Sequence, residues 1–368
     1  MRILAVCSLI LLALGGCGGG GKKTAEQPRS APPLPPPPRF LVGAVEDSAK
    51  SGDAKAQMQL ASDSGFGAVA LSALWNRGES APPAADLDPL RRAVEAAKAA
   101  RVRPILAVYQ FSSQTPVTDA DRAAFAAYTA ALVKALPDVA DLIVGNEPNL
   151  NLFWMPQFDA SGGDAAAPAY ALLLTKTYAA VKAVRKDVRV IGGALSPRGS
   201  DDPGASRQTH SPTQFIRDLG RPPMDAFAIH PYGETPRIPP TLQHPNTTSI
   251  SIADYPKLRA LLRDAYGKDL PIVYAEYGVE STIPSGKASL YTGKEVVQAV
   301  DEATQARYYR QAIGLAACQP TVKMLLLFHV QDEPRLEGLQ SGVRYADGSP
   351  KSSLAPVRTA AEHPSCQK

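Results

Sequence analysis

The sequence has few of the residues that bind metal ions, and its charge is close to balanced. Among its 368 residues are four cysteines and five histidines, with neither a Cys-x-x-Cys nor a His-x-x-x-His spacing. These absences argue against a metal site, and we expect no cofactor. The formal net charge is only +4, without the clustered basic face that nucleic-acid binding needs, so no nucleic-acid partner is expected.

Hydrophobic residues, by contrast, are plentiful. They make up 45% of the chain against 20% charged residues, so the body should bury a real core rather than stay disordered. Only two residues are tryptophan, at positions 75 and 154, which limits where a large aromatic platform can be built. The length suits one large catalytic domain preceded by targeting sequence.

The first residues have the pattern of an export signal. Arg2 supplies a positive charge, and Ile3–Leu14 is an apolar stretch shorter than the about 20 residues needed to span a bilayer. It leads into Leu14-Gly15-Gly16-Cys17, which resembles the lipobox of bacterial lipoproteins. We expect residues 1–16 to be removed and Cys17 to be lipidated, which anchors the protein in the bacterial cell envelope, facing the periplasm or the exterior. A plain secretion signal is the alternative.

Residues 17–39 have the composition of a linker. Gly18–Gly21 is a flexible run, and Pro32–Pro38 is almost entirely proline, which favours an extended polyproline II spacer. Cys7 would leave with the signal and Cys17 would carry lipid. Cys318 and Cys366 are then the remaining pair in an oxidising compartment, and we predict that they form a disulfide.

From Phe40 onward, short apolar runs alternate with longer stretches of helical periodicity. This rhythm predicts a parallel sheet with helical crossovers, and eight repeats predict a (β/α)₈ barrel as one domain over residues 40–362, followed by a tail at 363–368. A doubly wound open sheet is the rival, but Gly43–Asp47 lacks the G-x-G-x-x-G turn expected after its first strand. The predicted strands are Phe40–Val45, Gly67–Leu74, Arg103–Tyr109, Leu142–Gly145, Arg189–Gly193, Ala226–Ile229, Pro271–Ala275 and Met324–Phe328. The predicted helices are Leu87–Ala100 behind an Asp86 cap, Asp119–Leu136, Ala167–Lys186, Asp254–Tyr266, Ala303–Ala317 and Ser352–Ala361, with a loop at Ser196–Ser211 before a short fifth helix.

Polar residues follow the apolar runs at the strand ends where barrel enzymes build their sites. Glu147 ends the fourth predicted strand and Glu276 ends the seventh, so the two carboxyl groups should face each other across the barrel mouth. Glycoside hydrolysis uses such a pair, one as an acid for the leaving oxygen and one at the anomeric carbon. A strand-end salt bridge is the structural alternative for either residue.

Three motifs carry a resemblance to a known group of enzymes. Gly145-Asn146-Glu147-Pro148-Asn149, His230-Pro231-Tyr232 and Tyr274-Ala275-Glu276-Tyr277-Gly278 resemble the motifs of strands four, six and seven in glycoside hydrolase clan A. Within the clan, the chain is most similar to bacterial proteins of families 39 and 5, over about residues 40–360. The resemblance implies a (β/α)₈ barrel and a retaining O-glycosyl hydrolase acting on β-glycosidic bonds.

The resemblance also implies roles for individual residues. Glu147 would be the acid/base and Glu276 the nucleophile, while Asn146 would bind the hydroxyl next to the anomeric carbon. His230 and Tyr232 share one face of their strand, and Tyr232 would donate to Glu276 and keep it ionised. Glu147 would start protonated, with its pKa raised by a less polar setting and by Glu276.

The chain departs from the clan at strand eight, where many members place a tryptophan and this sequence has Phe328 and His329. Trp75 and Trp154 are the candidates for stacking on sugar rings, with loop packing as the alternative. The predicted substrate-binding residues are Trp75, Trp154, Asn149, Tyr277, Phe328 and Asp332.

We therefore predict a monomeric, envelope-anchored glycosidase that binds an oligosaccharide or polysaccharide. The long loops Asn151–Ala166 and Gly233–Ile252 favour internal cleavage of a chain. Two alternatives are open: a catalytically inactive carbohydrate-binding lipoprotein, and a transglycosylase that remodels envelope glycans with the same chemistry. The sugar and the linkage are not encoded in these motifs.

Overall fold

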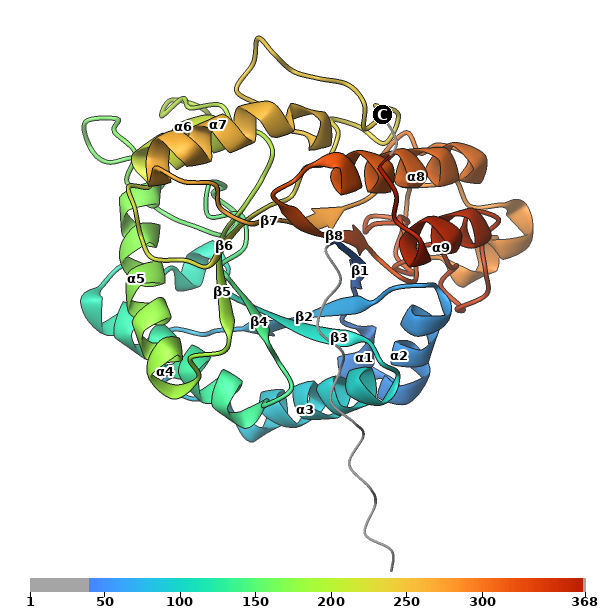
Figure 1. Ribbon diagram of the computed structural model, residues 1–368, viewed down its shortest axis with the longest axis horizontal. Coiled ribbons are helices and arrows are strands. Elements are labelled where there is room, and N and C mark those ends of the chain that lie inside the picture. Colours follow the sequence, from blue (N-terminus) through green and yellow to red (C-terminus); the bar gives the residue numbers. More distant parts are fainter. Residues whose placement is uncertain (1–39, 367–368) are drawn as a thin grey trace, which may run out of the picture. The chain divides into compact units, whose positions relative to one another are not determined.

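The computed structural model describes residues 40–366, which form a closed barrel of eight parallel strands surrounded by helices (Figure 1). Each strand pairs with the next in sequence, and the last strand pairs with the first. The strands are β1 (Leu41–Val45), β2 (Ala68–Leu74), β3 (Arg103–Tyr109), β4 (Asp141–Val144), β5 (Arg189–Leu195), β6 (Ala226–Ile229), β7 (Ile272–Tyr277) and β8 (Val322–Phe328). The predicted (β/α)₈ barrel is confirmed.

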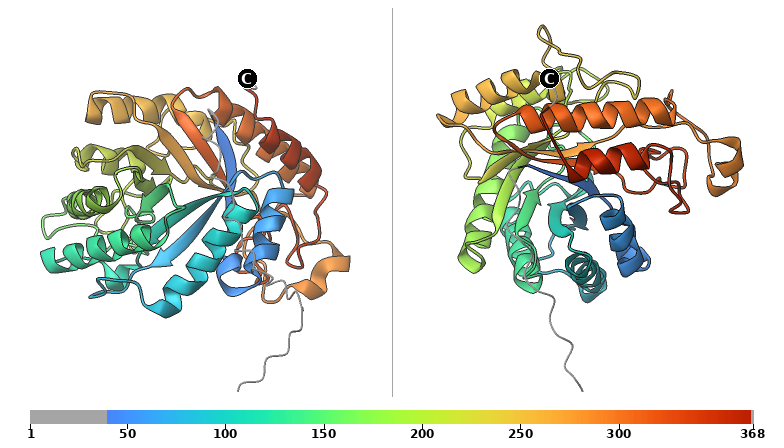
Figure 2. Two further views of the ribbon diagram at one scale, coloured as in Figure 1. Left: turned by 60° about the horizontal axis from the view of Figure 1, so that its bottom comes forward. Right: turned by 45° about the vertical axis from the view of Figure 1, so that its right-hand side comes forward.

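The helices form the outer ring of the barrel, and two further views show α8 and α9 side by side along one edge (Figure 2). Short 3₁₀ helices η1 (Ser112–Gln114), η2 (Ile252–Asp254) and η3 (Ser285–Leu290) lie in the connections. The α-helices are α1 (Ser48–Ser51), α2 (Ala54–Asp63), α3 (Ala84–Ala99), α4 (Asp119–Ala135), α5 (Ala166–Val184), α6 (Pro212–Asp218), α7 (Tyr255–Tyr266), α8 (Glu302–Cys318) and α9 (Leu354–Glu362).

The predicted start of α3 is wrong by three residues. The helix begins at Ala84 after Pro83, so Asp86 lies inside the first turn and is not the cap. Alanine is the best helix former, and an acidic side chain in the first turn is favourable next to the positive end of the helix dipole. The expected loop before a short fifth helix is confirmed, since α6 starts at Pro212 with Ser211 as its cap.

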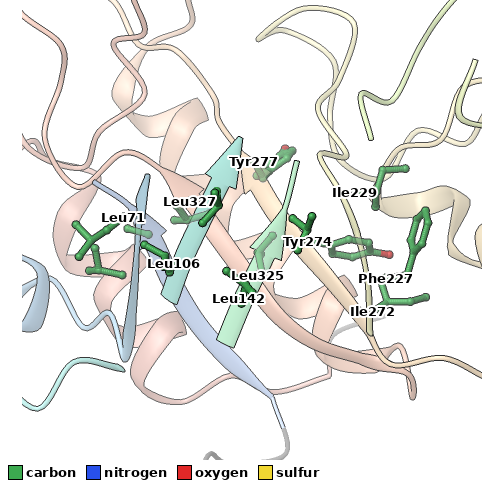
Figure 3. Packing of buried hydrophobic residues seen from close by; sticks show 14 of the residues in the cluster. Leu71, Leu106, Leu142, Phe227, Ile229, Ile272, Tyr274, Tyr277, Leu325 and Leu327 are labelled. Atoms are coloured by element: carbon green, nitrogen blue, oxygen red, sulfur yellow. The ribbon is translucent and has the colours of Figure 1, made fainter. Parts of the chain in front are cut away.

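Two apolar layers hold the barrel together. Inside it, small and β-branched side chains such as Ala70, Ile143 and Val273 fill the space between the strands. The alternate positions, among them Leu71 and Leu142, point outward into the layer between strands and helices (Figure 3). Successive strand side chains point to opposite faces, so each strand contributes to both layers and leaves its end residues at the barrel mouth.

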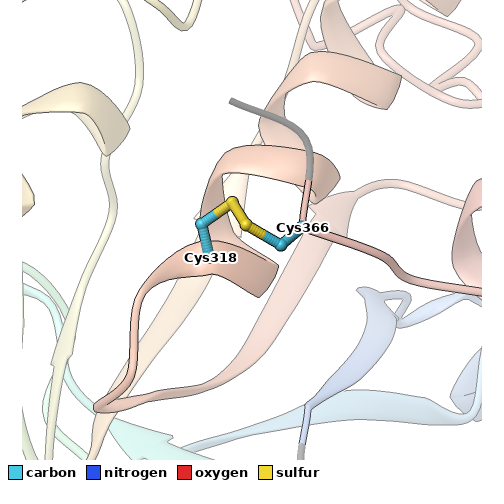
Figure 4. The surroundings of a disulfide bond; sticks show 2 residues. All are labelled: Cys318 and Cys366. Atoms are coloured by element: carbon cyan, nitrogen blue, oxygen red, sulfur yellow. A yellow bond between two sulfur atoms is a disulfide. The ribbon is translucent and has the colours of Figure 1, made fainter.

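The predicted disulfide is confirmed. Cys318, the last residue of α8, is bonded to Cys366, with their Cα atoms 4.5 Å apart (Figure 4). The bond closes a loop across a sequence separation of 48 residues that contains β8 and α9. In the chain-entropy model, a loop of this size stabilises the folded state by about 4 kcal/mol.

The predicted signal and lipidated Cys17 lie outside the described residues. Between residues 40 and 366, no helix is both long and apolar enough to cross a membrane.

Candidate active site

The end of β4 is shaped so that Glu147 enters the barrel mouth. Gly145 has a φ of +85°, and a Cβ there would lie 2.9 Å from the ring of Tyr170, so the position suits only glycine. Glu147 itself has a φ of +39°, a conformation that costs a non-glycine residue about 1–3 kcal/mol. Its N–H donates to the Ala194 carbonyl at 2.8 Å, which fixes it against the end of β5.

Tyr170 of α5 ties the ends of β4 and β5 together beneath this turn. Its hydroxyl donates to the Val144 carbonyl at 2.7 Å and accepts from the Gly193 N–H at 2.8 Å. The ring of Trp154 packs edge-on against Tyr170, with centroids 5.9 Å apart. A strained residue persists only where its surroundings over-determine it, and these contacts supply that constraint for Glu147.

Glu147 and Glu276 meet at one imidazole. His230 Nδ1 lies 3.1 Å from Glu147 Oε1 and 3.5 Å from Glu276 Oε2. Tyr232 donates its hydroxyl to Glu276 Oε2 at 3.1 Å, which is the contact expected from the sequence. Because a single nitrogen contacts both carboxylates, their facing oxygens can be no farther apart than the sum of these two distances.

The electrostatics of the pair agree only in part with the sequence-based expectation. Burial raises the pKa of the Glu276 carboxyl; His230 and the Tyr232 hydroxyl act in the opposite direction without cancelling this effect, and Glu147 adds to it. Burial lowers the pKa of His230, but the charges of Glu276 and Glu147 outweigh it and leave a net increase. The hydrogen bond from Tyr232 therefore favours the ionised form of Glu276 as expected, but burial outweighs it and the net shift of the Glu276 pKa is upward. A charged His230 is the stronger source of stabilisation.

A cavity of about 410 Å³ opens above the pair. Asn146, His230 and Phe328 line it as predicted for the site, together with both glutamates. We call it the central cavity. Its other lining residues are Val45, Asp47, Ala70, Leu71, Ser72, Ala107, Tyr109, Phe111, Ile143, Gly145, Leu152, Phe153, Ala275, His329 and Glu333.

One wall of the central cavity is polar and comes from β1 and β2. The Asp47 carboxylate accepts from the N–H of Ser72 at 2.9 Å and from its hydroxyl, and it pairs with Lys50 at 3.0 Å. The Asp47 side chain is 42% exposed, so its carboxylate is accessible to a ligand in the cavity. The sequence analysis did not single out Asp47 or Ser72. Asp47 follows the strand-end rule that identified the glutamates, whereas Ser72 lies inside β2.

The loops after β3 and β4 add an apolar shelf to the cavity, formed by Phe111, Leu152 and Phe153, which the sequence analysis also missed. The rings of Phe111 and Phe153 are stacked, with centroids 5.7 Å apart and planes 19° apart. Phe111 is 45% exposed and Leu152 is 57% exposed, values unusual for large apolar side chains. An exposed apolar surface at the rim of a cavity is typical of a binding groove. Leu152 also lines a second cavity of about 450 Å³, which contains Arg207.

The two tryptophans are not the sugar platform, contrary to the prediction. Trp75 and Trp154 are each only 1% exposed, and neither lines the central cavity. The Trp75 Nε1–H donates to the Glu79 carbonyl at 2.7 Å, and its ring packs edge-on against Phe125. Both are core residues that hold loops against the barrel.

Three other predicted substrate-binding residues are also structural. Asn149 is fully buried and links the loops after β4 and β5 through hydrogen bonds to the backbone of Ser196 and His210. Tyr277 is buried behind the site and stacks on Tyr232. The third is Asp332, which forms a fully buried ion pair with Lys351 at 2.7 Å. None of the three lines the central cavity.

Phe328 and His329 occupy the end of β8, where the clan resemblance leads one to look for a tryptophan. Both line the central cavity, and their ring centroids are 3.6 Å apart. His329 Nδ1 donates to the Val45 carbonyl at 2.9 Å, so the ring is tied to the end of β1. Its Nε2 has no hydrogen-bond partner within 3.5 Å among residues 40–366, but it lies 3.6 Å from Glu333 Oε1, another residue that lines the cavity.

Comparisons with known proteins find relatives by structure only. No protein-family model matches the sequence, and no curated protein matches it either. A family 39 glycoside hydrolase from Bacteroides cellulosilyticus is similar at 20% identity and a TM-score of 0.62, over 88% of this chain and 63% of that one. A β-glycosidase is similar at 16% identity and a TM-score of 0.61, over 90% of this chain and 98% of the other.

An exo-β-1,4-mannosidase from an Opitutaceae bacterium is similar at 14% identity and a TM-score of 0.57, over 88% of this chain and 59% of that enzyme. This chain therefore spans less than two thirds of the length of two of these three proteins. Identities at this level establish the architecture and not the activity. The chain has the same (β/α)₈ barrel fold as these glycoside hydrolases.

Proposed function

We propose that the protein is a retaining β-glycosidase that acts on an oligosaccharide or polysaccharide. The observation that carries the proposal is the convergence of Glu147 and Glu276 on His230 Nδ1, at 3.1 and 3.5 Å, inside a cavity large enough for a sugar. Retaining enzymes separate their carboxyl groups by about 5–5.5 Å, and inverting ones by about 6.5–9.5 Å. The shared contact to one nitrogen favours the shorter spacing.

In the first step, the Glu276 carboxylate attacks the anomeric carbon while Glu147 gives its proton to the departing oxygen. The glycosidic bond breaks and an ester between the sugar and Glu276 forms. In the second step, Glu147 takes a proton from water, the water oxygen bonds to the anomeric carbon, and the Glu276 carboxylate leaves. Asn146 lines the same cavity and supplies a polar contact for the hydroxyl beside the reacting carbon.

The direct test is to assay a panel of aryl β-glycosides and polysaccharides and to follow the first-formed anomer by NMR. Retention of configuration and a covalent sugar adduct on Glu276, trapped with a slow fluorinated substrate and located by mass spectrometry, are expected. An inverted first product would contradict the mechanism.

The apolar shelf supports a chain substrate rather than a single sugar. Sugar rings present C–H faces that pack on exposed aromatic rings such as Phe111 and Phe153. Leu152 lines both the central cavity and the neighbouring one, so the apolar shelf reaches the boundary between them. A second sugar unit of the same chain could bind on the apolar shelf. A site that binds several consecutive sugar units favours cleavage within a chain.

Replacing Phe111 or Phe153 with alanine should reduce the preference for longer substrates. We expect the ratio of kcat/KM for a tetrasaccharide to that for an aryl monoglycoside to fall about tenfold, the effect of losing one stacking contact worth about 1.4 kcal/mol. Leu172→Ala is the matched control, because Leu172 is 54% exposed but lies on α5 away from the cavities. An unchanged ratio in both phenylalanine variants would exclude the shelf as a sugar site.

We also propose that the protein is exported and anchored through Cys17. Cys17→Ser should move the protein from the membrane fraction to the soluble fraction, measured by fractionation and immunoblotting. Cys7→Ser is the matched control, because Cys7 lies within the segment that would be removed. A Cys17→Ser protein that stays in the membrane fraction with unchanged processing would refute the lipid anchor.

A further inference from the structure

A third cavity, distinct from the central cavity and from the one beside Leu152, adjoins the candidate catalytic pair on the side of Glu147. It has a volume of about 310 Å³ and is built by the loops after β5, β6 and β7. Glu147 and Tyr232 line it, whereas Glu276 does not. A cavity that reaches the acid but not the nucleophile lies on the side where the protonated oxygen departs. We call it the Glu280 cavity.

Glu280 is the unusual residue of this cavity. It lines the wall, is only 6% exposed, and its Oε2 has no hydrogen-bond partner within residues 40–366. Leaving a buried polar atom unpaired costs about 1–3 kcal/mol, and more when the atom carries charge. Such an atom beside a cavity is an acceptor that a ligand can satisfy. The proposed mechanism gives Glu280 no role.

The electrostatic surroundings of Glu280 contain further carboxylates. Burial, together with the charges of Glu295, Asp332 and Glu333, raises the pKa of Glu280 to about 7, with a partial offset from a hydrogen bond to the backbone of Gln340. A cation placed next to Glu280 would favour the ionised carboxylate and relieve this repulsion.

The charges that line the cavity favour a cationic ligand over an anionic one. Arg198 is the one cationic lining residue, and its Nη1 donates to the Tyr232 carbonyl at 3.2 Å. The negative charges of Glu234 and Glu147 act on Arg198 and partly offset the lowering of its pKa by burial. Within residues 40–366 Glu280 forms no ion pair, because Lys351, whose charge it helps to stabilise, is paired with Asp332. The Glu280 carboxylate is therefore open to pairing with a cationic ligand.

We propose that the Glu280 cavity is the leaving-group subsite and that it takes a sugar with a free amino group, whose ammonium donates to Glu280. The inference rests on the proposed glycosidase function and adds the chemistry of the departing unit to it. The ligand is then a hexosamine within the substrate chain. An uncharged sugar would leave the Glu280 carboxylate without a positively charged partner. The carboxylate of a uronic acid would be repelled by Glu280.

The test uses the leaving-group subsite in reverse. An aryl β-glycoside loads the sugar onto Glu276, and a free sugar bound in the subsite then competes with water. In that transfer Glu147 takes the proton of the acceptor hydroxyl, the acceptor oxygen bonds to the anomeric carbon, and the ester to Glu276 breaks. Glucosamine, N-acetylglucosamine, glucose and glucuronic acid are compared at equal concentration and pH 7, with products quantified by mass spectrometry.

Transfer to glucosamine should exceed transfer to glucose by about tenfold, which is the effect of one charge-assisted hydrogen bond. N-acetylglucosamine, which lacks the charge, should behave like glucose. In Glu280→Gln, which keeps the shape but removes the charge, the ratio of glucosamine to glucose transfer should fall to about one. Glu95→Gln is the matched control, because Glu95 is exposed on α3 far from the cavity, and it should keep the wild-type ratio.

Equal transfer to glucosamine and glucose in the wild type would overturn the inference. A preference for glucosamine that survives in Glu280→Gln would overturn it as well. A preference for glucuronic acid would also overturn it, and would assign ligand binding in the subsite to Arg198. If no aryl glycoside is cleaved, the proposed function fails, and binding is measured directly by ligand-observed NMR with glucosamine and glucose. Glucosamine binding lost in Glu280→Gln would still support the site, and equal binding of both sugars would refute it. Circular dichroism and thermal melting establish that each variant is folded.

Discussion

Glu276→Ala is expected to lower kcat by about 10⁴-fold or more on every substrate, as the loss of a nucleophile does in enzymes that form covalent intermediates. The reason is geometric: Glu276 is the one carboxylate of the pair that receives the Tyr232 hydrogen bond, at 3.1 Å, and it faces the interior of the central cavity. In the alanine variant the carboxylate beside the anomeric carbon is missing. Neither water nor Glu147 provides a negatively charged nucleophile at that position.

Added azide should partly restore turnover of activated aryl glycosides in this variant. The small anion enters the vacated space and attacks from the face that Glu276 occupied, so the glycosyl azide has the configuration opposite to that of the substrate. The product is identified by NMR. Glu95→Gln, whose side chain is exposed on α3, provides the control for a charge change outside the site. Full activity in Glu276→Ala would assign the nucleophile elsewhere.

Glu147→Ala should show a loss that depends on the leaving group. General acid catalysis contributes about 10²–10⁴-fold, so kcat/KM on oligosaccharides should fall by this factor. Aryl glycosides with acidic phenols need little protonation and should lose least in the first step. Their second step should slow, because Glu147 no longer deprotonates the attacking water, and the sugar adduct on Glu276 should accumulate.

Azide distinguishes the two variants. In Glu147→Ala it replaces water at the adduct and gives a glycosyl azide with the configuration of the substrate, the opposite of the product from Glu276→Ala. A plot of log kcat/KM against the leaving-group pKa should be steeper for Glu147→Ala than for the wild type. Equal slopes, or azide products of the reversed configuration, would show that the roles of Glu147 and Glu276 are exchanged or absent.

The sequence predicts the barrel well because each strand is buried on both faces of the sheet and therefore appears in the sequence as a short apolar run. The strand positions agree with the structure within a few residues, and β3 and β6 agree at both ends. Glu147 and Glu276 were found because they directly follow such runs. The first crossover helices, α1 and α2, were given no bounds. The start of α1 has no side-chain cap to mark it, whereas α2 begins behind Asp53, a cap that the sequence analysis did not use.

Loop side chains could not be placed in this way. Phe153 and Trp154 are neighbours in the loop after β4, yet Phe153 lines the cavity and Trp154 is 1% exposed. A loop has no periodic rule that assigns one side chain to the cavity and the next to the core. Tryptophan is also the larger ring, so it was the more attractive candidate on chemistry alone, and its burial against Tyr170 depends on contacts distant in sequence.

The contact between β1 and β8 has a consequence for the order in which the protein is made. Val45 and His329 are hydrogen-bonded although 284 residues separate them, and Glu46 accepts from the N–H of Gln331 across the same junction. Closing so long a loop is entropically slow, and β1 has an open edge until β8 arrives. The ribosome synthesises β8 last of the eight strands. A nascent chain therefore contains β1 to β7 before Phe328 and His329, which line the central cavity, have been made. Activity should therefore appear only after synthesis of the barrel is complete, with no partially active shorter intermediate.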